Sequence, residues 1–292
     1  MKQYFTAKVH GMCGGVFAAL KVLDEVVARH PDVYVFRELV HNKSITADLT
    51  ARGVHFVNDI DSIPPGSAIV LGAHGVAAET EKILRAKASF CRDATCPLVK
   101  KLHRIAAALT PQDQLIICGK AGHPEVTGIA GNSGTREVFI VQNTADAARL
   151  PDMPHPVFIS QTTVDHNEVN AVRDFLLQRY PGLREYSGVC DASRRRQEAV
   201  IELASRCDLV LVIGSAHSSN AKRLCEIARR QGANAFLIDH AGEIPAADLM
   251  QAEKVGVTSG ASTPEHLFDG VTAALCKYGF TCGDAVSGTP NT

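Results

Sequence analysis

The sequence lacks an excess of charge of either sign. Its 292 residues include 30 Lys and Arg against 31 Asp and Glu. Such a balance produces no global electrostatic field of the kind that attracts nucleic acid or an anionic membrane. We therefore expect neither as a partner, and any anionic ligand must be bound by a local group of side chains.

Long hydrophobic runs are also missing. The most apolar stretches, "SAIVLGA" and "DLVLVIGS", are far shorter than the roughly 20 residues that cross a membrane. The opening "MKQYFTAKVHGMC" has no apolar core of signal-peptide length. We expect a cytoplasmic protein, and a hydrophobic share of 46% is sufficient to bury the cores of two or three compact units.

The nine cysteines form neither a dense framework nor a Cys-x-x-Cys motif. An odd, scattered set is typical of a reducing compartment, where thiols stay reduced or bind metals. Most of the nine are expected to be ordinary core residues, because cysteine is often buried. A zinc site normally takes two ligands from one short loop, so the missing motif argues against zinc.

Three segments of the chain nevertheless share one pattern that begins at a cysteine. Cys13, Cys96 and Cys190 are each followed by apolar residues at helical spacing, which predicts helices over 14–30, 97–110 and 191–206. Pro97 supports the second helix, since proline is favoured at the first helical position. Each of these cysteines is therefore predicted to lie at a helix start.

A short apolar strand and a polar turn follow each predicted helix. The strands are "DVYVFREL", "QLIICG" and "DLVLVIG", and the turns place His41, His123 and Ser218 at 28, 27 and 28 residues after the respective cysteine. Each unit then continues with two more strands. The last of these strands is followed by His74 in the first unit, by Thr162 and Thr163 in the second, and by Ser259 and Ser262 in the third.

This alternation predicts an α/β fold of three similar units with parallel sheets and right-handed crossovers. The predicted units are 1–95, 96–189 and 190–292. Ligands of such sheets bind beyond the carboxyl ends of the strands, where the polar turns occur. We therefore expect a pseudo-threefold arrangement in which the three cysteines and the turns face one central cavity.

Three thiolates from three separate loops suit an iron-sulfur cluster better than zinc. A cubane cluster with three cysteine ligands leaves its fourth iron open, where it can act as a Lewis acid toward a substrate oxygen. The amino-terminal ends of the three predicted helices would help to offset the negative charge of the cluster. The alternative for any single cysteine is a place in the core, and Cys91 is expected to be such a buried residue at a strand end.

The polar turns are rich in hydrogen-bond donors that carry no fixed charge, which suits a diphosphate that must later be released. These residues are His41, His74, His123, Ser218, Asn220 and Ser262. Glu125 is the carboxylate of these turns, and a closed cavity that raises its pKa would let it deliver protons. Thr162 could relay such a proton or orient a substrate hydroxyl. An acid at the start of a helix is the alternative interpretation of Glu125.

The motifs resemble those of one known family over nearly the whole chain, from Cys13 to about residue 275. They read "VHN", "AHGV", "DATCPLVKKLH", "GKAGHPEVTG", "SQTT", "RRQEAV", "GSAHSSN" and "VTSGASTPEHL". In this length and order they are similar to the hydroxymethylbutenyl diphosphate reductases, the IspH/LytB family of the methylerythritol phosphate route to isoprenoids. Motifs of this length and order are highly specific.

The resemblance implies a [4Fe-4S] cluster bound by Cys13, Cys96 and Cys190, with one open iron. It implies diphosphate contacts at His41, His74, His123, Ser218, Ser219, Asn220 and Ser262. It further implies that Glu125 is the proton source and that Thr162 lies near the substrate hydroxyl. The implied reaction removes that allylic hydroxyl with two electrons and two protons, giving isopentenyl and dimethylallyl diphosphates, with a ferredoxin or flavodoxin as electron donor.

The sequence departs from the family pattern at Met12, Phe17, Ala18 and Asp191. Its last stretch, "KYGFTCGDAVSGTPNT", is also shorter than the extended C-terminal tail that is usual in the family. An unscreened carboxylate at Asp191 would lower the reduction potential of a nearby cluster. Three interpretations therefore stand. The chain is the reductase of the usual five-carbon substrate, a paralogue acting on another allylic or alkynyl diphosphate, or a cluster-bearing sensor without turnover. Glu125 and Thr162 argue against the sensor.

Overall fold

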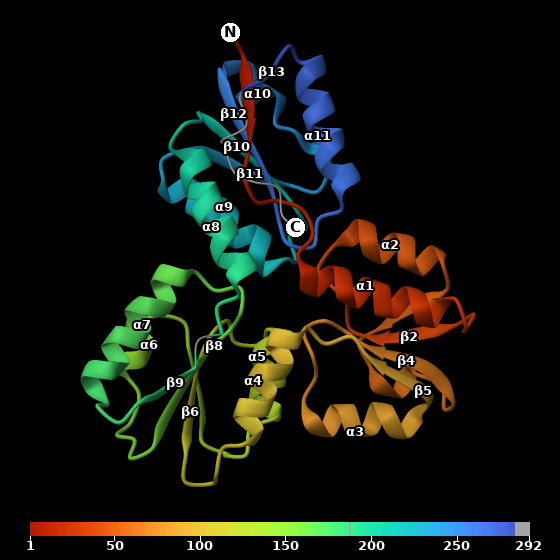
Figure 1. The fold of residues 1–292 in the computed structure, drawn as a ribbon, viewed down its shortest axis with the longest axis vertical. Helices are drawn as coiled ribbons and strands as arrows, with labels where there is room; N and C mark the ends of the chain where they lie inside the picture. The colour runs from red at the N-terminus through yellow and green to blue at the C-terminus, as the bar shows by residue number, and fades with distance from the viewer. Residues whose placement is uncertain (187, 284–292) are drawn as a thin grey trace. The chain divides into compact units, whose positions relative to one another are not determined.

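Parallel β-strands form three separate sheets in the computed structural model, which describes residues 1–186 and 188–283 (Figure 1). The strand orders are β11-β10-β12-β1-β13, β3-β2-β4-β5 and β7-β6-β8-β9. Every strand pair recorded in them is parallel. The α/β fold with three parallel sheets is thus confirmed.

The chain packs as two compact units. Unit 1 comprises Met1–Cys13, His41–Ile45 and Asp191–Thr292, and unit 2 comprises Gly14–Val40 and Thr46–Cys190. Unit 1 contains the five-stranded sheet, and unit 2 contains both four-stranded sheets. The three predicted units, with their boundaries at 95/96 and 189/190, remain a prediction.

The sheet of unit 1 is covered by helices on both faces. Its strands are β1 (Gln3–Thr6), β10 (Leu209–Ile213), β11 (Asn234–Ile238), β12 (Lys254–Ser259) and β13 (Thr281–Cys282). Its helices are α8 (Asp191–Ala204), α9 (Ser219–Arg230), η2 (Ala241–Glu243), α10 (Ala246–Gln251) and α11 (Glu265–Lys277). Successive residues of β10 alternate between the faces: Val210 and Val212 pack with α8 and α9, whereas Leu211 packs with α10 and α11.

The first sheet of unit 2 follows the first predicted pattern. Its strands are β2 (Val33–Phe36), β3 (Val54–Val57), β4 (Ser67–Leu71) and β5 (Ala88–Asp93). Its helices are α1 (Gly14–Val27), η1 (Ile60–Ser62), α3 (Ala78–Lys87) and α2 (Lys43–Ala51), which belongs to unit 2 from Thr46 on. Cys91 lies inside β5 and is half-buried against the core formed by Ile69, Leu71 and Leu84. It packs against this core as expected, but it lies inside the strand and is only half-buried, whereas the sequence predicts a buried residue at the strand end.

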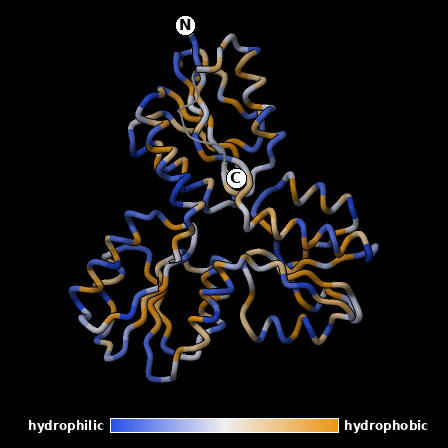
Figure 2. Tube along the Cα trace, viewed as in Figure 1, coloured by the Kyte–Doolittle hydropathy of each residue, from blue (hydrophilic) through white to orange (hydrophobic). Residues whose placement is uncertain are grey.

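The second sheet of unit 2 carries most of the candidate catalytic residues. Its strands are β6 (Gln114–Cys118), β7 (Val138–Val141), β8 (Pro156–Ser160) and β9 (Arg184–Tyr186). Its helices are α4 (Pro97–Ala107), α5 (Pro124–Gly131), α6 (Thr144–Ala148) and α7 (His166–Arg179). Leu115 and Ile117 of β6 pack against α4 and α5, whereas Ile116 and Cys118 pack against α6 and α7. Figure 2 shows the corresponding hydrophobic colour along these strands.

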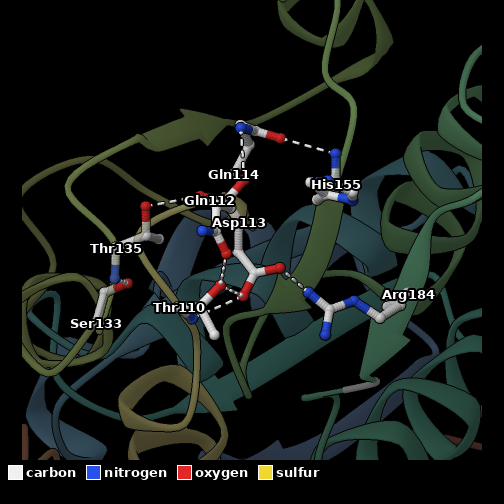
Figure 3. A network of polar contacts seen from close by, with 8 residues as sticks. All are labelled: Thr110, Gln112, Asp113, Gln114, Ser133, Thr135, His155 and Arg184. Atoms are coloured by element: carbon white, nitrogen blue, oxygen red, sulfur yellow. Dashed lines mark hydrogen bonds and ion pairs between the residues drawn. The ribbon is translucent and has the colours of Figure 1, made fainter.

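A polar network fastens the amino-terminal ends of this second sheet (Figure 3). The carboxylate of Asp113 accepts hydrogen bonds from Thr110 and forms an ion pair with Arg184 at the start of β9. Gln114 accepts a hydrogen bond from the backbone of His155, at 2.9 Å, just before β8. The network therefore fixes one end of the sheet, and the polar turns follow the other end.

The predicted elements agree with the structure around all three cysteines. Helices α1, α4 and α8 begin at the residue after Cys13, Cys96 and Cys190. Among the described residues, no helix is long and apolar enough to cross a membrane.

Candidate active site

Six of the predicted site residues lie in unit 2, in the segments that follow the carboxyl ends of strands β4, β5, β6, β8 and β9. They are His74, Cys96, His123, Glu125, Thr162 and Cys190. The carboxyl ends of parallel strands share one edge of a sheet, which is the usual ligand-binding edge of this fold class.

Glu125 and Thr162 form the most direct pair among these residues. The backbone N–H of Thr162 donates to Oε1 of Glu125 at 2.7 Å, and its hydroxyl donates to Oε2 at 2.8 Å. Glu125 is in the first turn of α5, where an acid favoured by the helix dipole is expected, but its side chain is only 1% exposed. The carboxyl therefore turns inward to Thr162 instead of facing solvent.

Burial controls the protonation of this carboxyl. Loss of solvation raises the pKa of Glu125 to about 7, although the two hydrogen bonds from Thr162 act to lower this pKa. A carboxyl with a pKa near neutrality can be protonated and then lose its proton within one reaction cycle. The pair thus has the properties of a general acid.

Two imidazoles lie beside this acid. His123 caps α5, because its Nδ1 accepts a hydrogen bond from the backbone N–H of Glu125 at 3.2 Å. In the neutral ring the proton is then on Nε2, which is a donor. The ring of His74 meets the ring of His123 edge to face, with 5.7 Å between centroids. The structure thus brings together both predicted imidazoles of unit 2.

The thiol-bearing loops are tied to the same strand ends. The backbone N–H of Cys96 donates to the carbonyl of Ala73, next to His74, at 3.0 Å. The backbone N–H of Cys190 donates to the carbonyl of Thr162 at 3.2 Å. Thr162 therefore contacts both Glu125 through its donors and the cysteine loop through its carbonyl.

The other predicted site residues lie in unit 1, where the loop after β12 connects them. The backbone carbonyl of Ala261 accepts from the N–H of Cys13 at 2.9 Å, and its N–H donates to Oδ1 of Asn220 at 2.9 Å. The hydroxyl of the next residue, Ser262, donates to the carbonyl of His41 at 3.0 Å. Two adjacent residues thus bring Cys13, His41 and Asn220 together.

Asn220 has a donor that no described residue uses. Its Oδ1 is fixed by the Ala261 N–H, so its Nδ2 must point the other way, and this nitrogen is buried without a hydrogen-bond partner among the described residues. A buried donor left unsatisfied is costly in a folded protein. Ser218 caps α9 through its hydroxyl, and Ser219 is the first residue of that helix. A helix start with an unused amide donor is suited to an anion.

Arg196 is a site-supporting residue that the sequence does not distinguish from its neighbours. It lies in α8, is 3% exposed, and donates from Nη2 to the carbonyl of Gly11 at 2.6 Å, two residues before Cys13. The N–H of Gly11 in turn donates to Ser259 at 2.7 Å. In the run of arginines 194–196, only a helical-wheel argument could have separated the buried residue from its exposed neighbours.

Asp191, one of the departures from the family pattern, does not carry an uncompensated charge. Its carboxylate forms ion pairs with Arg194 at 2.5 Å and with Arg195 at 2.7 Å. These arginine partners hold the pKa of Asp191 below its usual range. The negative charge of Asp191, which would lower the potential of a nearby cluster if it were unscreened, is therefore offset by two residues of the same helix.

The remaining departures lie around the start of α1 and at the end of the chain. Met12 is half-buried, whereas Phe17 and Ala18 are exposed. Most of the short terminal segment, residues 284–292, lies outside the described residues.

The nine cysteines, all within the described part of the chain, form no disulfide. Cys118, Cys207 and Cys225 are buried in the hydrophobic cores, whereas the thiols that precede α1, α4 and α8 are partly exposed. Among residues 1–186 and 188–283, no group of three His, Cys, Asp or Glu side chains is arranged to bind a metal ion. The donor type of these three partly exposed thiols, soft sulfur at helix starts, nevertheless fits an iron-sulfur cluster.

Comparison with known proteins identifies the family. The family model described as LytB protein matches residues 5–276. The chain belongs to this family. It is 38% identical over 295 residues to the 4-hydroxy-3-methylbut-2-enyl diphosphate reductase of Xylella fastidiosa (strain M12), covering 97% of this chain and 93% of the relative. The enzyme of the same name from Psychrobacter sp. (strain PRwf-1) is 37% identical, with 98% and 93% covered.

Solved structures of the family agree with this assignment. The E-1-hydroxy-2-methyl-but-2-enyl-4-diphosphate reductase of Plasmodium falciparum superimposes with a TM-score of 0.94 at 27% identity, covering 99% of this chain and 93% of the other. A second structure, of (E)-4-hydroxy-3-methyl-but-2-enyl diphosphate reductase, gives a TM-score of 0.66 at 27% identity over 95% and 100% of the two chains. The family predicted from the motifs is confirmed.

Proposed function

We propose that this protein is a 4-hydroxy-3-methylbut-2-enyl diphosphate reductase that gives isopentenyl and dimethylallyl diphosphates. The observation that carries the proposal is the buried Glu125, whose pKa of about 7 makes it a proton donor at neutral pH. The names of the relatives support the substrate. A sensor without turnover would have no use for such a group, because sensing needs no general acid.

The reaction replaces a hydroxyl by hydrogen on an allylic chain. One C–O bond breaks and one C–H bond forms. Two electrons and one proton supply the new C–H bond, and a second proton converts the departing hydroxyl into water. We propose that Cys13, Cys96 and Cys190 are the ligands of a [4Fe-4S] cluster. When bound, such a cluster supplies electrons and Lewis acidity.

The protein's own residues then perform binding and proton transfer. The Nε2–H group of His123 donates to the diphosphate, and His41, His74, Ser218, Ser219, Asn220 and Ser262 add further donors. The Nδ2 of Asn220 is an unused donor among the described residues, which supports its part in this set. Hydrogen bonds from neutral groups bind an anion without the strong permanent attraction of lysine or arginine, so the product can leave.

Thr162 keeps the acid in the correct orientation. With Glu125 protonated, the Oε2–H can donate to the Thr162 hydroxyl, while the Thr162 backbone N–H continues to hold Oε1. The hydroxyl of Thr162 can then pass a proton toward the substrate oxygen, since it is both donor and acceptor. Glu125 and Thr162 thus act as one proton-delivering unit.

We further propose that the electron donor is a ferredoxin or flavodoxin and that the protein is cytoplasmic, as expected from the sequence. The test is anaerobic turnover of hydroxymethylbutenyl diphosphate with a reduced dye, using protein whose iron content has been measured. We expect both five-carbon diphosphates as products. Iron-replete protein that forms neither would overturn the proposal, and turnover of a different allylic diphosphate alone would identify the paralogue.

A further inference from the structure

His103 occupies a slot between two glycines that lie on two elements of the candidate site in unit 2. It is in the second turn of α4, the helix that begins after Cys96. A methyl group at Gly75 would lie 2.5 Å from Cε1 of His103, and one at Gly128 would lie 2.9 Å from Nε2. Gly75 follows His74 directly, and Gly128 is one helical turn after Glu125. The ring therefore fills the space between these two elements.

Gly75 and Gly128 are needed at these positions because the ring is there. Gly75 also has a φ of +68°, in the left-handed region that favours glycine. Gly128 is in the middle of α5, where glycine costs about 1 kcal/mol relative to alanine. A glycine inside a helix, with an imidazole edge against its α-carbon, marks a close approach that a larger side chain would prevent.

The tautomer of His103 follows from Asn132. Its Nδ2 donates to the carbonyls of Val76 at 2.8 Å and Gly128 at 2.7 Å, which fixes the orientation of the amide. The same nitrogen lies 3.2 Å from Nδ1 of His103. Both amide hydrogens are already donated to the two carbonyls, so Nδ1 meets the amide nitrogen as a close contact. A ring N–H at Nδ1 would have no acceptor there, which favours the neutral tautomer with its proton on Nε2. Asn132 therefore joins the turn after His74, helix α5 and the ring.

The protonated ring nitrogen is buried. Nε2 has no hydrogen-bond partner among the described residues. Burial lowers the pKa of His103, while the carboxyls of Glu81 and Asp93 act to raise this pKa. Those carboxyls line, with Lys100, Arg104 and His103 itself, a cavity of about 440 Å³. The ring thus remains neutral and acts as a rigid spacer.

We propose that His103 is a positioning residue, which sets the distance between the turn that carries His74 and the helix that carries His123 and Glu125. The inference rests on the proposed function, because the positioned groups are the diphosphate donors and the proton source. His103 itself touches no substrate in this scheme. Its role is to keep the edge-to-face contact of His74 and His123 in place while α4 holds Cys96.

The first test measures kinetics of the holoenzyme with His103→Ala. We expect normal iron content, because Cys96 is unchanged, together with a KM for the diphosphate that rises at least fivefold. A general loss of folded protein would instead lower kcat at constant KM. The control is His30→Ala, which removes another ring of unit 2, stacked on Phe90 at 4.8 Å, and should leave KM unchanged. An unaltered KM in iron-replete His103→Ala would overturn the proposal.

The second test needs no turnover, so it separates this proposal from the proposed reaction. Gly128→Ala should lower the Tm of the apoprotein, and His103→Ala should relieve that loss, because the new methyl enters the vacated slot. Gly131→Ala in the same helix meets Ala77 at 2.3 Å instead, so its effect should add to that of His103→Ala without relief. Additive Tm changes in both double-mutant cycles would contradict the role of His103 as a spacer.

Imidazole NMR of the apoprotein completes this test. The Nδ1 of His103 should show the shift of an unprotonated nitrogen, and His103→Ala should displace the ring resonances of His74 and His123. Undisplaced resonances would contradict the positioning role even if the enzyme turns over its substrate. If the Tm and NMR results on the apoprotein are as expected but the holoenzyme forms no five-carbon product, the spacer role of His103 is supported and the proposed reaction is wrong.

Discussion

Thr162 donates two hydrogen bonds to one carboxyl group, that of Glu125, through its backbone N–H and its hydroxyl. Both bonds favour the carboxylate, yet burial is the larger effect and the pKa of Glu125 is raised to about 7. The balance between these opposing effects determines how the acid responds to substitution.

Replacing the acid by its amide should separate catalysis from folding. Glu125→Gln is expected to bind iron normally and to lower turnover by about 10²–10⁴-fold, the usual contribution of a general acid. Wild-type turnover should fall above pH 7 as Glu125 loses its proton, whereas the residual rate of the variant should not follow that limb. Steady-state rates between pH 6 and 9 check this, and equal rates for the two proteins would remove Glu125 from the proton role.

Glu125→Gln should lower turnover, but it should raise the stability of the folded protein at neutral and higher pH. The pKa of Glu125 is raised in the folded state, so the native protein loses stability as pH increases from about 4.5 to about 7. This shift corresponds to a loss on the order of 3 kcal/mol above pH 7. In urea unfolding of the apoproteins, the free energy of unfolding of Glu125→Gln should increase relative to that of the wild type as the pH is raised from 5 to 8. A difference in the free energy of unfolding that does not change with pH would contradict a raised pKa at Glu125.

Removing only the hydroxyl of the partner tests the orientation of the acid. Thr162→Val keeps the backbone N–H bond to Glu125 and loses a bond that favours the carboxylate, so the pKa of Glu125 should rise further. The alkaline limb of the rate profile is expected to move to higher pH, and the maximal rate to fall about tenfold. Thr272→Val, at a partly exposed position of α11, serves as the control. An unshifted limb would show that the hydroxyl does not act on the acid.

The cysteines provide an internally matched series. Serine at positions 13, 96 or 190 should abolish iron binding after anaerobic reconstitution, because each change removes a thiolate ligand. Cys91→Ser, which alters a half-buried residue of β5 only five positions before Cys96, should retain full iron. Iron assays and visible absorption distinguish the outcomes. Full iron in any of the first three variants would contradict the ligand set.

Asn220 allows an isosteric test of the diphosphate contacts. Asn220→Asp keeps an oxygen for the Ala261 N–H and replaces the unused Nδ2 donor by an acceptor that repels phosphate. We expect the KM to rise at least tenfold, equivalent to about 1.4 kcal/mol of binding free energy. The exposed Asn167→Asp should have no such effect. Unchanged KM for Asn220→Asp would place the diphosphate elsewhere.

The ion pairs of Asp191 lead to an expectation about the cluster. Because Arg194 and Arg195 already offset this carboxylate, Asp191→Asn should change the midpoint potential little. Removing both arginines in the Asp191 protein should lower the potential, since the carboxylate is then unscreened. Potentiometric titration followed by EPR measures both. A large upward shift for Asp191→Asn would show that the ion pairs do not screen it.

Local pattern was sufficient to predict the elements that carry the site. The helices after Cys13, Cys96 and Cys190 and the strands that follow them are determined by apolar spacing, and the polar turns follow from strand ends. The inward turn of Glu125 was not predictable, because an acid at a helix start is equally consistent with solvent exposure. Its contact with Thr162 joins residues 37 positions apart.

Two supporting residues were missed for a related reason. Arg196 stands in a run of three arginines, and His103 is one polar residue on an otherwise amphipathic helix. Their roles depend on backbone groups of distant segments, the carbonyl of Gly11 and the α-carbons of Gly75 and Gly128. Periodicity shows which face of a helix is buried, but it does not show what that face meets.

Strand β1 has a consequence for the order in which the chain can fold. Its residues Gln3–Thr6 pair with β12 on one side and with β13, at Thr281 and Cys282, on the other. A ribosome releases these first residues long before their partners exist. The loop that holds Cys13 follows β1 directly, so it can take its final form only after synthesis has reached β12. We therefore expect cluster insertion to be a late, post-translational event, and nascent chains shorter than about 260 residues to retain no iron.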